Sequence, residues 1–175
     1  MARAFLLGLA ALLTGCGTAP PLPVAGPVDL PRFMGTWYVI ANIPTFIEKG
    51  AHNAVESYRL SPEGVVETTF TFRAGSFDGP LKRYTPRGFV REGTGNAVWG
   101  MQFLWPIEAD YRIAWVSPDY SQTLIARERR DYLWIMARQP QIPEEDYLAL
   151  VARAKALGYA VENIQKVPQR WGAGS

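Results

Sequence analysis

The chain has 175 residues, enough for one domain, and its 48% hydrophobic against 19% charged residues are typical of a globular protein rather than a disordered one. The formal net charge is only +2 and the charges are scattered, which argues against nucleic acid as a partner. Cys16 is the only cysteine, so no intramolecular disulfide can form and packing must hold the fold.

Residues 1–15 have the pattern of a targeting segment. Arg3 supplies a positive charge, and Phe5 to Leu13 form an apolar run. That run is shorter than the roughly 20 residues that a membrane-spanning helix needs. We therefore predict a signal peptide over residues 1–15 that is absent from the folded protein.

The junction after this segment reads Leu13-Thr14-Gly15-Cys16, which resembles the lipobox of bacterial lipoproteins. The resemblance implies that the Cys16 thiol receives a diacylglycerol and that Cys16 becomes the acylated N-terminus, anchoring the chain to a membrane. Gly17 in place of Asp implies sorting to the outer membrane, with the domain facing the periplasm. An ordinary cleaved signal followed by a chance cysteine is the alternative.

Residues 16–31 comprise Cys16 and a segment rich in Pro, Gly and Ala, which predicts an extended, flexible tether. The folded domain is expected over residues 32–168, followed by a tail over residues 169–175.

Eight short runs of alternating apolar residues, separated by turn signals, follow in order. They predict an all-β fold: an eight-stranded up-and-down antiparallel barrel, with an open sandwich as its competitor. The predicted strands are Trp37–Ile43, Ala54–Leu60, Val65–Phe72, Lys82–Arg91, Ala97–Leu104, Tyr111–Val116, Thr123–Arg129 and Tyr132–Arg138.

One helix is predicted near the end of the chain. Pro143 suits its first position, and apolar residues from Tyr147 to Leu157 recur at helical spacing before Gly158 ends it. The single apolar stripe predicts that the helix packs against the outside of the barrel. Tyr159–Val167 is expected to return as a short final strand.

Two motifs carry a resemblance to the lipocalin family. Gly35-Thr36-Trp37-Tyr38 matches the G-x-W motif of its first strand, and Arg138 stands where the family has an arginine after the eighth strand. The resemblance implies that the Arg138 guanidinium packs across the Trp37 indole and closes one end of the barrel. It covers about residues 32–168 and extends to the bacterial lipocalins through residues 130–140.

The family also has a T-D-Y motif in the turn after the sixth strand. This chain has Pro118-Asp119-Tyr120, so the usual contacts of that turn are in doubt.

Strand parity predicts which side chains face the barrel interior, because alternate residues of a strand point to the same side. Ala41 follows Trp37 and Val39 on the inward side of the first strand. The inward residues are expected to line an apolar ligand-binding cup, unless they pack together and fill the barrel. The ligand-binding set is Val39, Glu56, Tyr58, Phe70, Phe72, Phe89, Trp99, Met101, Tyr111, Ile113, Trp115, Trp134 and Met136.

Glu56 is the exception in this set, because it is acidic and shares the parity of Ala54 and Tyr58. A buried carboxylate needs a partner or stays protonated. Either Glu56 faces the cavity, or a bulge turns it outward.

The sequence contains no catalytic or metal-binding motif, and its one histidine, His52, is expected in an exposed loop. We therefore predict a non-enzymatic carrier, without cofactor or metal, for a fatty acid, lysophospholipid or similar lipid. An enzyme acting on a lipid or isoprenoid through Glu56 or Tyr111 is one alternative, and a structural protein with a filled barrel is another. The resemblance to bacterial lipocalins leaves a homodimer open.

Overall fold

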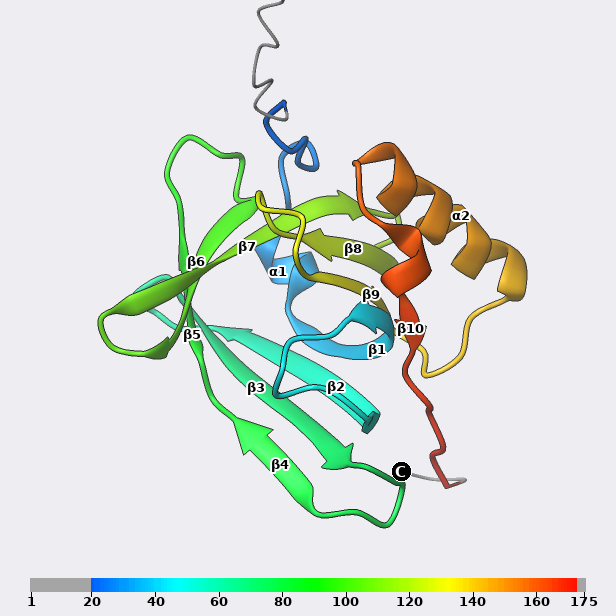
Figure 1. The fold of residues 1–175 in the computed structure, drawn as a ribbon. Coiled ribbons are helices and arrows are strands. Elements are labelled where there is room, and N and C mark those ends of the chain that lie inside the picture. The colour runs from blue at the N-terminus through cyan, green and yellow to red at the C-terminus, as the bar shows by residue number, and fades with distance from the viewer. Residues whose placement is uncertain (1–19, 173–175) are drawn as a thin grey trace, which may run out of the picture.

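The computed structural model describes residues 20–172, and the leader and Cys16 lie outside the described residues. One antiparallel sheet of ten strands curls into a barrel, closed by pairing of β1 with β9. Figure 1 shows the strands winding around the barrel with α2 outside it. The elements are α1 Leu30–Phe33, β1 Gly35–Ile43, β2 Ala51–Leu60, β3 Val65–Ala74, β4 Leu81–Tyr84, β5 Arg87–Val90, β6 Val98–Leu104, β7 Ile107–Val116, β8 Gln122–Ala126, β9 Leu133–Ala137, α2 Glu144–Ala156, a 3-10 turn Val161–Asn163 and β10 Gln165–Lys166.

The eight-stranded barrel is confirmed, with two differences that give the extra strands. The strand predicted over Lys82–Arg91 is broken into β4 and β5 at Thr85 and Pro86, and both pieces pair with β3. Pro86 has no N–H for the ladder, although its carbonyl still accepts from Thr68 at 3.1 Å. The short β10 pairs with β1 at Ala41 and Asn42, beyond the residues of β1 that pair with β2.

Helix α2 packs on the outer face of β8 and β9, as its apolar stripe predicts. Leu150 and Ala154 are fully buried there, in a cluster with Leu124 and Ile135 of the two strands. Pro143 caps the helix one position before its first turn, and Gly158 has a φ of +88° where the helix stops.

The final strand is shorter than predicted. Instead of one strand over Tyr159–Val167, the chain makes a 3-10 turn and pairs over two residues only. Tyr159 is buried, and its hydroxyl accepts from the Arg127 N–H at 2.8 Å and shares its one proton between the carbonyls of Arg127 and Tyr132, each 3.0 Å away. These hydrogen bonds hold Tyr159 against the side of the barrel, and the chain joins the sheet only at Gln165.

Residues 20–29 do not form the predicted free tether. This segment, the N-terminal strap, lies along the barrel, with Leu22 and Val28 only 3% and 2% exposed. The Ala25 N–H donates to Ile113 and the Val28 N–H to Gly95, both at 2.8 Å. The prediction failed because Pro, Gly and Ala indicate extended backbone without showing what that backbone lies against.

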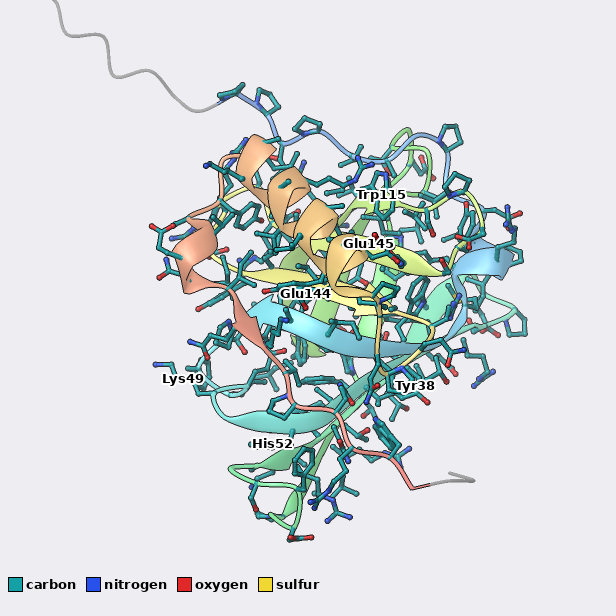
Figure 2. All side chains as sticks on the ribbon, turned by 90° about the vertical axis from the view of Figure 1, so that its right-hand side faces the viewer. Tyr38, Lys49, His52, Trp115, Glu144 and Glu145 are labelled. Carbon is teal, nitrogen blue, oxygen red and sulfur yellow. The ribbon has the colours of Figure 1, made fainter. Side chains whose placement is uncertain are left out.

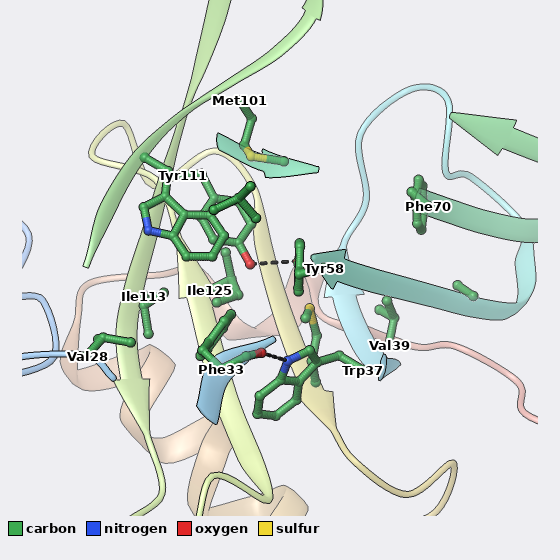
Figure 3. Packing of buried hydrophobic residues seen from close by; sticks show 14 of the residues in the cluster. Val28, Phe33, Trp37, Val39, Tyr58, Phe70, Met101, Tyr111, Ile113 and Ile125 are labelled. Atoms are coloured by element: carbon green, nitrogen blue, oxygen red, sulfur yellow. Dashed lines mark hydrogen bonds between the residues drawn. The ribbon is translucent and has the colours of Figure 1, made fainter. Parts of the chain in front are cut away.

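The strap ends in α1, which closes one end of the barrel. Asp29 caps this short helix by accepting from the Arg32 N–H at 3.2 Å. Phe33 then points into the barrel, fully buried, with its ring 5.0 Å from that of Trp37. The Phe33 carbonyl accepts from the Trp37 indole N–H at 2.8 Å, as Figure 3 shows. Within residues 20–172, no such plug closes the opposite end.

Candidate ligand-binding cavity

A cavity of about 520 Å³ occupies the end of the barrel opposite α1. Its wall includes residues 45–48 of the β1–β2 loop, the beginning of β7, and Arg127 and Tyr132 of the β8–β9 loop. Most of the remaining wall is apolar or aromatic, with Phe70 and Met101 among its side chains. A mainly apolar cavity of this volume with a few polar groups is typical of small-molecule sites.

The predicted inward residues divide between two levels of the barrel. One group lines the cavity: Glu56, Phe70, Met101, Tyr111 and Trp134. The other is buried in the packed interior and is not part of the cavity wall: Val39, Tyr58, Phe72, Trp99, Ile113 and Met136. The barrel is therefore filled by its own side chains at the closed end, part of which Figure 3 shows, and it holds the cavity at the open end.

Trp115 was predicted inside and lies outside. The pairing of β7 with β8 shifts register between Ile113 and Trp115, and this irregularity inverts the parity of the strand. Ile113 faces the interior, whereas Trp115 belongs to the cluster under α2, with the Arg153 guanidinium 4.4 Å from the centre of its ring. Figure 2 shows Trp115 near that helix. A similar shift after Val39 sends Ala41 to the outer cluster instead of the interior.

Phe89 was also assigned to the wrong face. Its neighbour Gly88 faces the interior, because a Cβ there would lie 3.0 Å from the Met101 sulfur and 3.1 Å from Val66. Phe89 therefore points outward, where the Arg87 guanidinium lies 5.4 Å from the centre of its ring. The interior at this point has room only for glycine, which parity arguments do not detect.

Glu56 faces the cavity, which settles the choice left open by the sequence. The irregularity in β2 lies between His52 and Val55, so Glu56 and Tyr58 keep the same parity and Glu56 stands opposite Phe70 of β3. The Tyr58 hydroxyl donates to the Glu56 carboxylate, and the Tyr58 and Tyr111 hydroxyls are 2.8 Å apart. Because Tyr58 gives its proton to Glu56, Tyr111 is the donor in the second bond.

The position of Glu56 controls its ionisation. Burial is the main cause that raises its pKa from 4.5 to about 7; the Tyr58 hydrogen bond opposes the rise and the charge of Glu48 adds to it. Burial also raises the pKa values of Tyr58 and Tyr111 well above 10, so both remain hydrogen-bond donors. The cavity thus holds a carboxyl group that is partly protonated near neutral pH.

Sequence reasoning missed Glu48, a second acid in the cavity wall. It is 4% exposed and accepts from the Thr45 backbone N–H at 3.0 Å, the Thr45 hydroxyl at 2.6 Å and the Trp134 indole N–H at 2.8 Å. These bonds tie the β1–β2 loop to β9 at the mouth of the cavity. Glu48 lies in a turn, where no strand periodicity predicts its direction.

Arg127 is another missed residue. It lines the cavity from the β8–β9 loop, and its Nε is buried without a hydrogen-bond partner within residues 20–172. Its Nη1 lies 3.5 Å from the Asp131 carboxylate. From the sequence, Arg127 is only a residue near the end of the strand predicted over Thr123–Arg129.

The closed end has the predicted Trp37–Arg138 pair. The guanidinium carbon of Arg138 lies 3.8 Å from the centre of the Trp37 ring, and burial lowers the pKa of this arginine. Its N–H groups donate to five carbonyls, those of Arg32, Phe33, Met34, Thr36 and Tyr120, at 2.8–3.2 Å. One side chain therefore ties α1, β1 and the β7–β8 turn together.

The altered turn motif keeps a structural role. The Tyr120 hydroxyl accepts from the Asp29 N–H at 2.9 Å, which joins this turn to the strap. Asp119 accepts from the Ser117 and Ser121 hydroxyls at 2.6 and 2.8 Å, and these bonds lower its pKa to about 2. The turn thus holds its shape with Pro118 in place of threonine.

Within residues 20–172, no group of three or more His, Cys, Asp or Glu side chains is placed to hold a metal ion. His52 lies in β2 rather than in a loop and packs edge-on against Phe77, with ring centres 4.9 Å apart. No helix of the described chain is long and apolar enough to cross a membrane.

A barrel with one plugged end and one open, apolar cavity defines a class of small-ligand carriers. The model of the lipocalin-like domain matches residues 28–169, and the chain therefore belongs to the lipocalin family. Family and cavity together support the binding of a small hydrophobic ligand.

Its relatives include plant and bacterial proteins. Temperature-induced lipocalin-1 of Arabidopsis thaliana is 30% identical over 154 residues, covering 81% of this chain and 80% of the relative. Outer membrane lipoprotein Blc of Escherichia coli (strain K12) is 27% identical over 171 residues and covers 90% of each chain. Among solved structures, insecticyanin from the tobacco hornworm Manduca sexta matches with a TM-score of 0.69 at 13% identity, over 89% of this chain and 87% of that one.

Proposed function

We propose that this protein is a non-enzymatic, lipid-anchored carrier of the outer membrane that binds a fatty acid, lysophospholipid or similar lipid and serves envelope maintenance. The cavity carries the proposal: about 520 Å³, open at one end and mainly apolar. Each methylene moved from water into such a wall contributes about 0.8 kcal/mol, so about ten would give micromolar binding.

The polar groups of the wall suit the head of such a ligand. Glu56 and Tyr111 lie in the wall with their hydrogen bonds to Tyr58, and Glu48 and Arg127 lie closer to the loops of the mouth. A partly protonated Glu56 can donate to, or accept from, a hydroxyl or carboxyl group. The acyl chain would lie against Phe70 and Met101.

The anchor and the location rest on the sequence and on the relatives. The Leu13-Thr14-Gly15-Cys16 junction supports acylation of Cys16, and Gly17 supports the outer membrane with a periplasmic domain. Relatives named outer membrane lipoprotein Blc, 26–27% identical over 90% of this chain, support the same location.

A cavity-filling variant tests the carrier. Ala109 lines the cavity from β7, so Ala109→Trp places an indole where the ligand would lie. Titration with a fluorescent fatty acid should show an affinity at least about tenfold lower than in the unaltered chain. The matched control is Ala152→Trp on the exposed side of α2, which should leave the affinity unchanged.

Equal affinity in the unaltered chain and Ala109→Trp would contradict the proposal. Native mass spectrometry of the purified protein adds a second reading, with a co-purified lipid expected. Conversion of an added lipid to product would favour the enzyme alternative, with Glu56 and Tyr111 as its acid and base. A barrel that neither retains nor binds lipid would favour a structural protein.

A further inference from the structure

Five large apolar side chains stand in solvent around the mouth of the cavity. Phe46 of the β1–β2 loop is 82% exposed, and four residues at the β6–β7 hairpin are 54–79% exposed. We call this set the apolar rim: Phe46, Phe103, Leu104, Trp105 and Ile107. Exposed apolar side chains gathered in this way mark an interaction surface.

The rim is continuous with the cavity. Phe46 and Phe103 line the cavity wall and are also exposed on the outside, whereas Leu104, Trp105 and Ile107 extend the apolar surface away from it. The acyl chain of a ligand that leaves the cavity between these side chains would stay in contact with apolar surface. Figure 1 shows the β6–β7 hairpin projecting beyond the body of the barrel.

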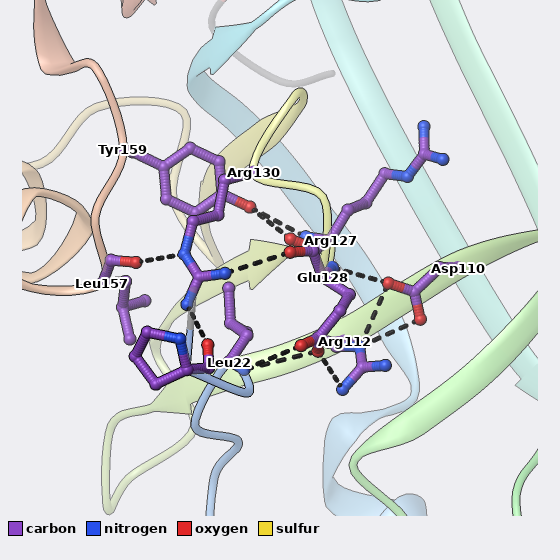
Figure 4. A network of polar contacts seen from close by, with 9 residues as sticks. Leu22, Asp110, Arg112, Arg127, Glu128, Arg130, Leu157 and Tyr159 are labelled. Atoms are coloured by element: carbon purple, nitrogen blue, oxygen red, sulfur yellow. Dashed lines mark hydrogen bonds and ion pairs between the residues drawn. The ribbon is translucent and has the colours of Figure 1, made fainter. Parts of the chain in front are cut away.

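The N-terminal strap brings the beginning of the chain to this same end. The Leu22 N–H donates to the Glu128 carboxylate at 3.1 Å, and the Pro20 carbonyl accepts from Arg130 at 2.8 Å. Glu128 and Arg130 belong to the β8–β9 loop, which also supplies Arg127 and Tyr132 to the cavity wall. Figure 4 shows this network, in which Arg112 and Asp110 of β7 hold Glu128.

The direction of the strap limits where a membrane anchor can be. From Pro20 the strap runs toward α1 at the closed end, so the described chain begins beside the open end of the barrel. Cys16 is four residues before Pro20, and four residues span at most about 14 Å. An acylated Cys16 would thus be confined to the end of the barrel that carries the rim.

We propose that the apolar rim docks on a lipid bilayer, with Trp105 and its neighbours in the interfacial layer and the cavity mouth open to the membrane. Trp suits this position because its ring is apolar and its indole N–H can bond to water or head groups. The carrier function assigns a ligand and an anchor, whereas this inference assigns the face that meets the membrane. Docking by the rim requires neither a bound ligand nor acylation.

The test uses the chain from residue 17 to residue 175, which lacks Cys16. The strands and both core clusters of the described structure lie within residues 20–172, so this chain retains all of them. Flotation with vesicles of phosphatidylethanolamine and phosphatidylglycerol measures the lipid concentration that binds half of the protein. The unaltered chain should float, and a variant with Leu104→Ser, Trp105→Ser and Ile107→Ser should need at least about ten times more lipid.

A matched pair controls for the loss of apolar surface in general. Leu104 and Leu148 are 72% and 56% exposed, but Leu148 lies on α2, away from the rim. Leu104→Ser should weaken flotation, and Leu148→Ser should leave it unchanged. Fatty-acid binding without vesicles should be the same in all variants, because none of the altered residues lines the cavity.

Three outcomes would overturn the docking. The unaltered chain fails to float, the triple variant floats equally well, or Leu148→Ser loses as much binding as Leu104→Ser. If sedimentation shows a dimer that the triple variant separates while vesicle binding persists, the rim joins two copies instead. If the unaltered chain does not bind the fatty acid, the carrier function is contradicted and the docking result is unaffected.

Discussion

Glu56 is an acidic residue in the cavity wall, and its surroundings change its ionisation. Burial raises its pKa to about 7, and its hydrogen bonds connect it through Tyr58 to Tyr111. The native chain therefore holds a proton on Glu56 at pH values where the unfolded chain has lost it. Linkage then requires the stability contributed by Glu56 to be full below pH 4.5 and to fall as the pH rises through 7.

Replacing Glu56 tests this linkage. Glu56→Gln should remove the loss of stability between about pH 4.5 and 7 and leave the protein about 3 kcal/mol more stable than the unaltered chain at pH 8. Urea unfolding at several pH values measures the difference. Glu92→Gln, at an exposed position, is the control and should follow the curve of the unaltered chain. A flat curve for the unaltered chain over this window would show that Glu56 is not held protonated.

The N-terminal strap differs from the flexible tether that its composition predicts. It has the composition of a linker, yet Leu22 packs with Ala126, Leu133 and Tyr159 in the cluster that also receives α2. At its other end, the Asn96 side-chain amide donates to the Val28 carbonyl at 3.0 Å. The strap thus begins in the outer cluster under α2 and ends in the interior cluster, to which Val28 belongs.

A single side-chain substitution, Leu22→Ala, tests whether the strap is packed on the barrel or is a free tether. Leu22→Ala should lower the free energy of unfolding by about 2–3 kcal/mol, because it leaves a cavity in a closed cluster. Denaturant midpoints at constant slope measure the change. Pro21→Ala, one residue earlier and exposed, is the control and should stay within about 0.5 kcal/mol. Equal stability of both variants would mean that the strap leaves the barrel in solution.

At the scale of the whole molecule, the barrel has two unlike ends. Arg138 and α1 seal one, while the other holds the cavity, the exposed rim and the beginning of the strap. This polarity matters for the proposed carrier, because an anchor at Cys16 would turn the open end toward a bilayer.

Acylation of Cys16 is the prediction that belongs to the whole molecule. Cells given labelled palmitate should incorporate the label into this protein, and the label should co-fractionate with the outer membrane. Cys16→Ala should take up no label, because the acceptor thiol is absent. Ser175→Ala is a control far along the chain and should label normally. Incorporation of label by Cys16→Ala would contradict the interpretation of residues 13–16 as a lipobox.

The sequence by itself determined the barrel and the outer helix, because both follow from local periodicity, and the resemblance to the lipocalin motifs predicted the Trp37–Arg138 closure. Only the tertiary structure decided which aromatic residues reach the cavity. Register shifts after Val39 and Ile113 sent Ala41 and Trp115 outward, and a tight approach at Gly88 sent Phe89 outward. The bonds of Glu48, the burial of Glu56 and the packing of Leu22 each depend on partners distant in sequence, whose positions local patterns do not specify.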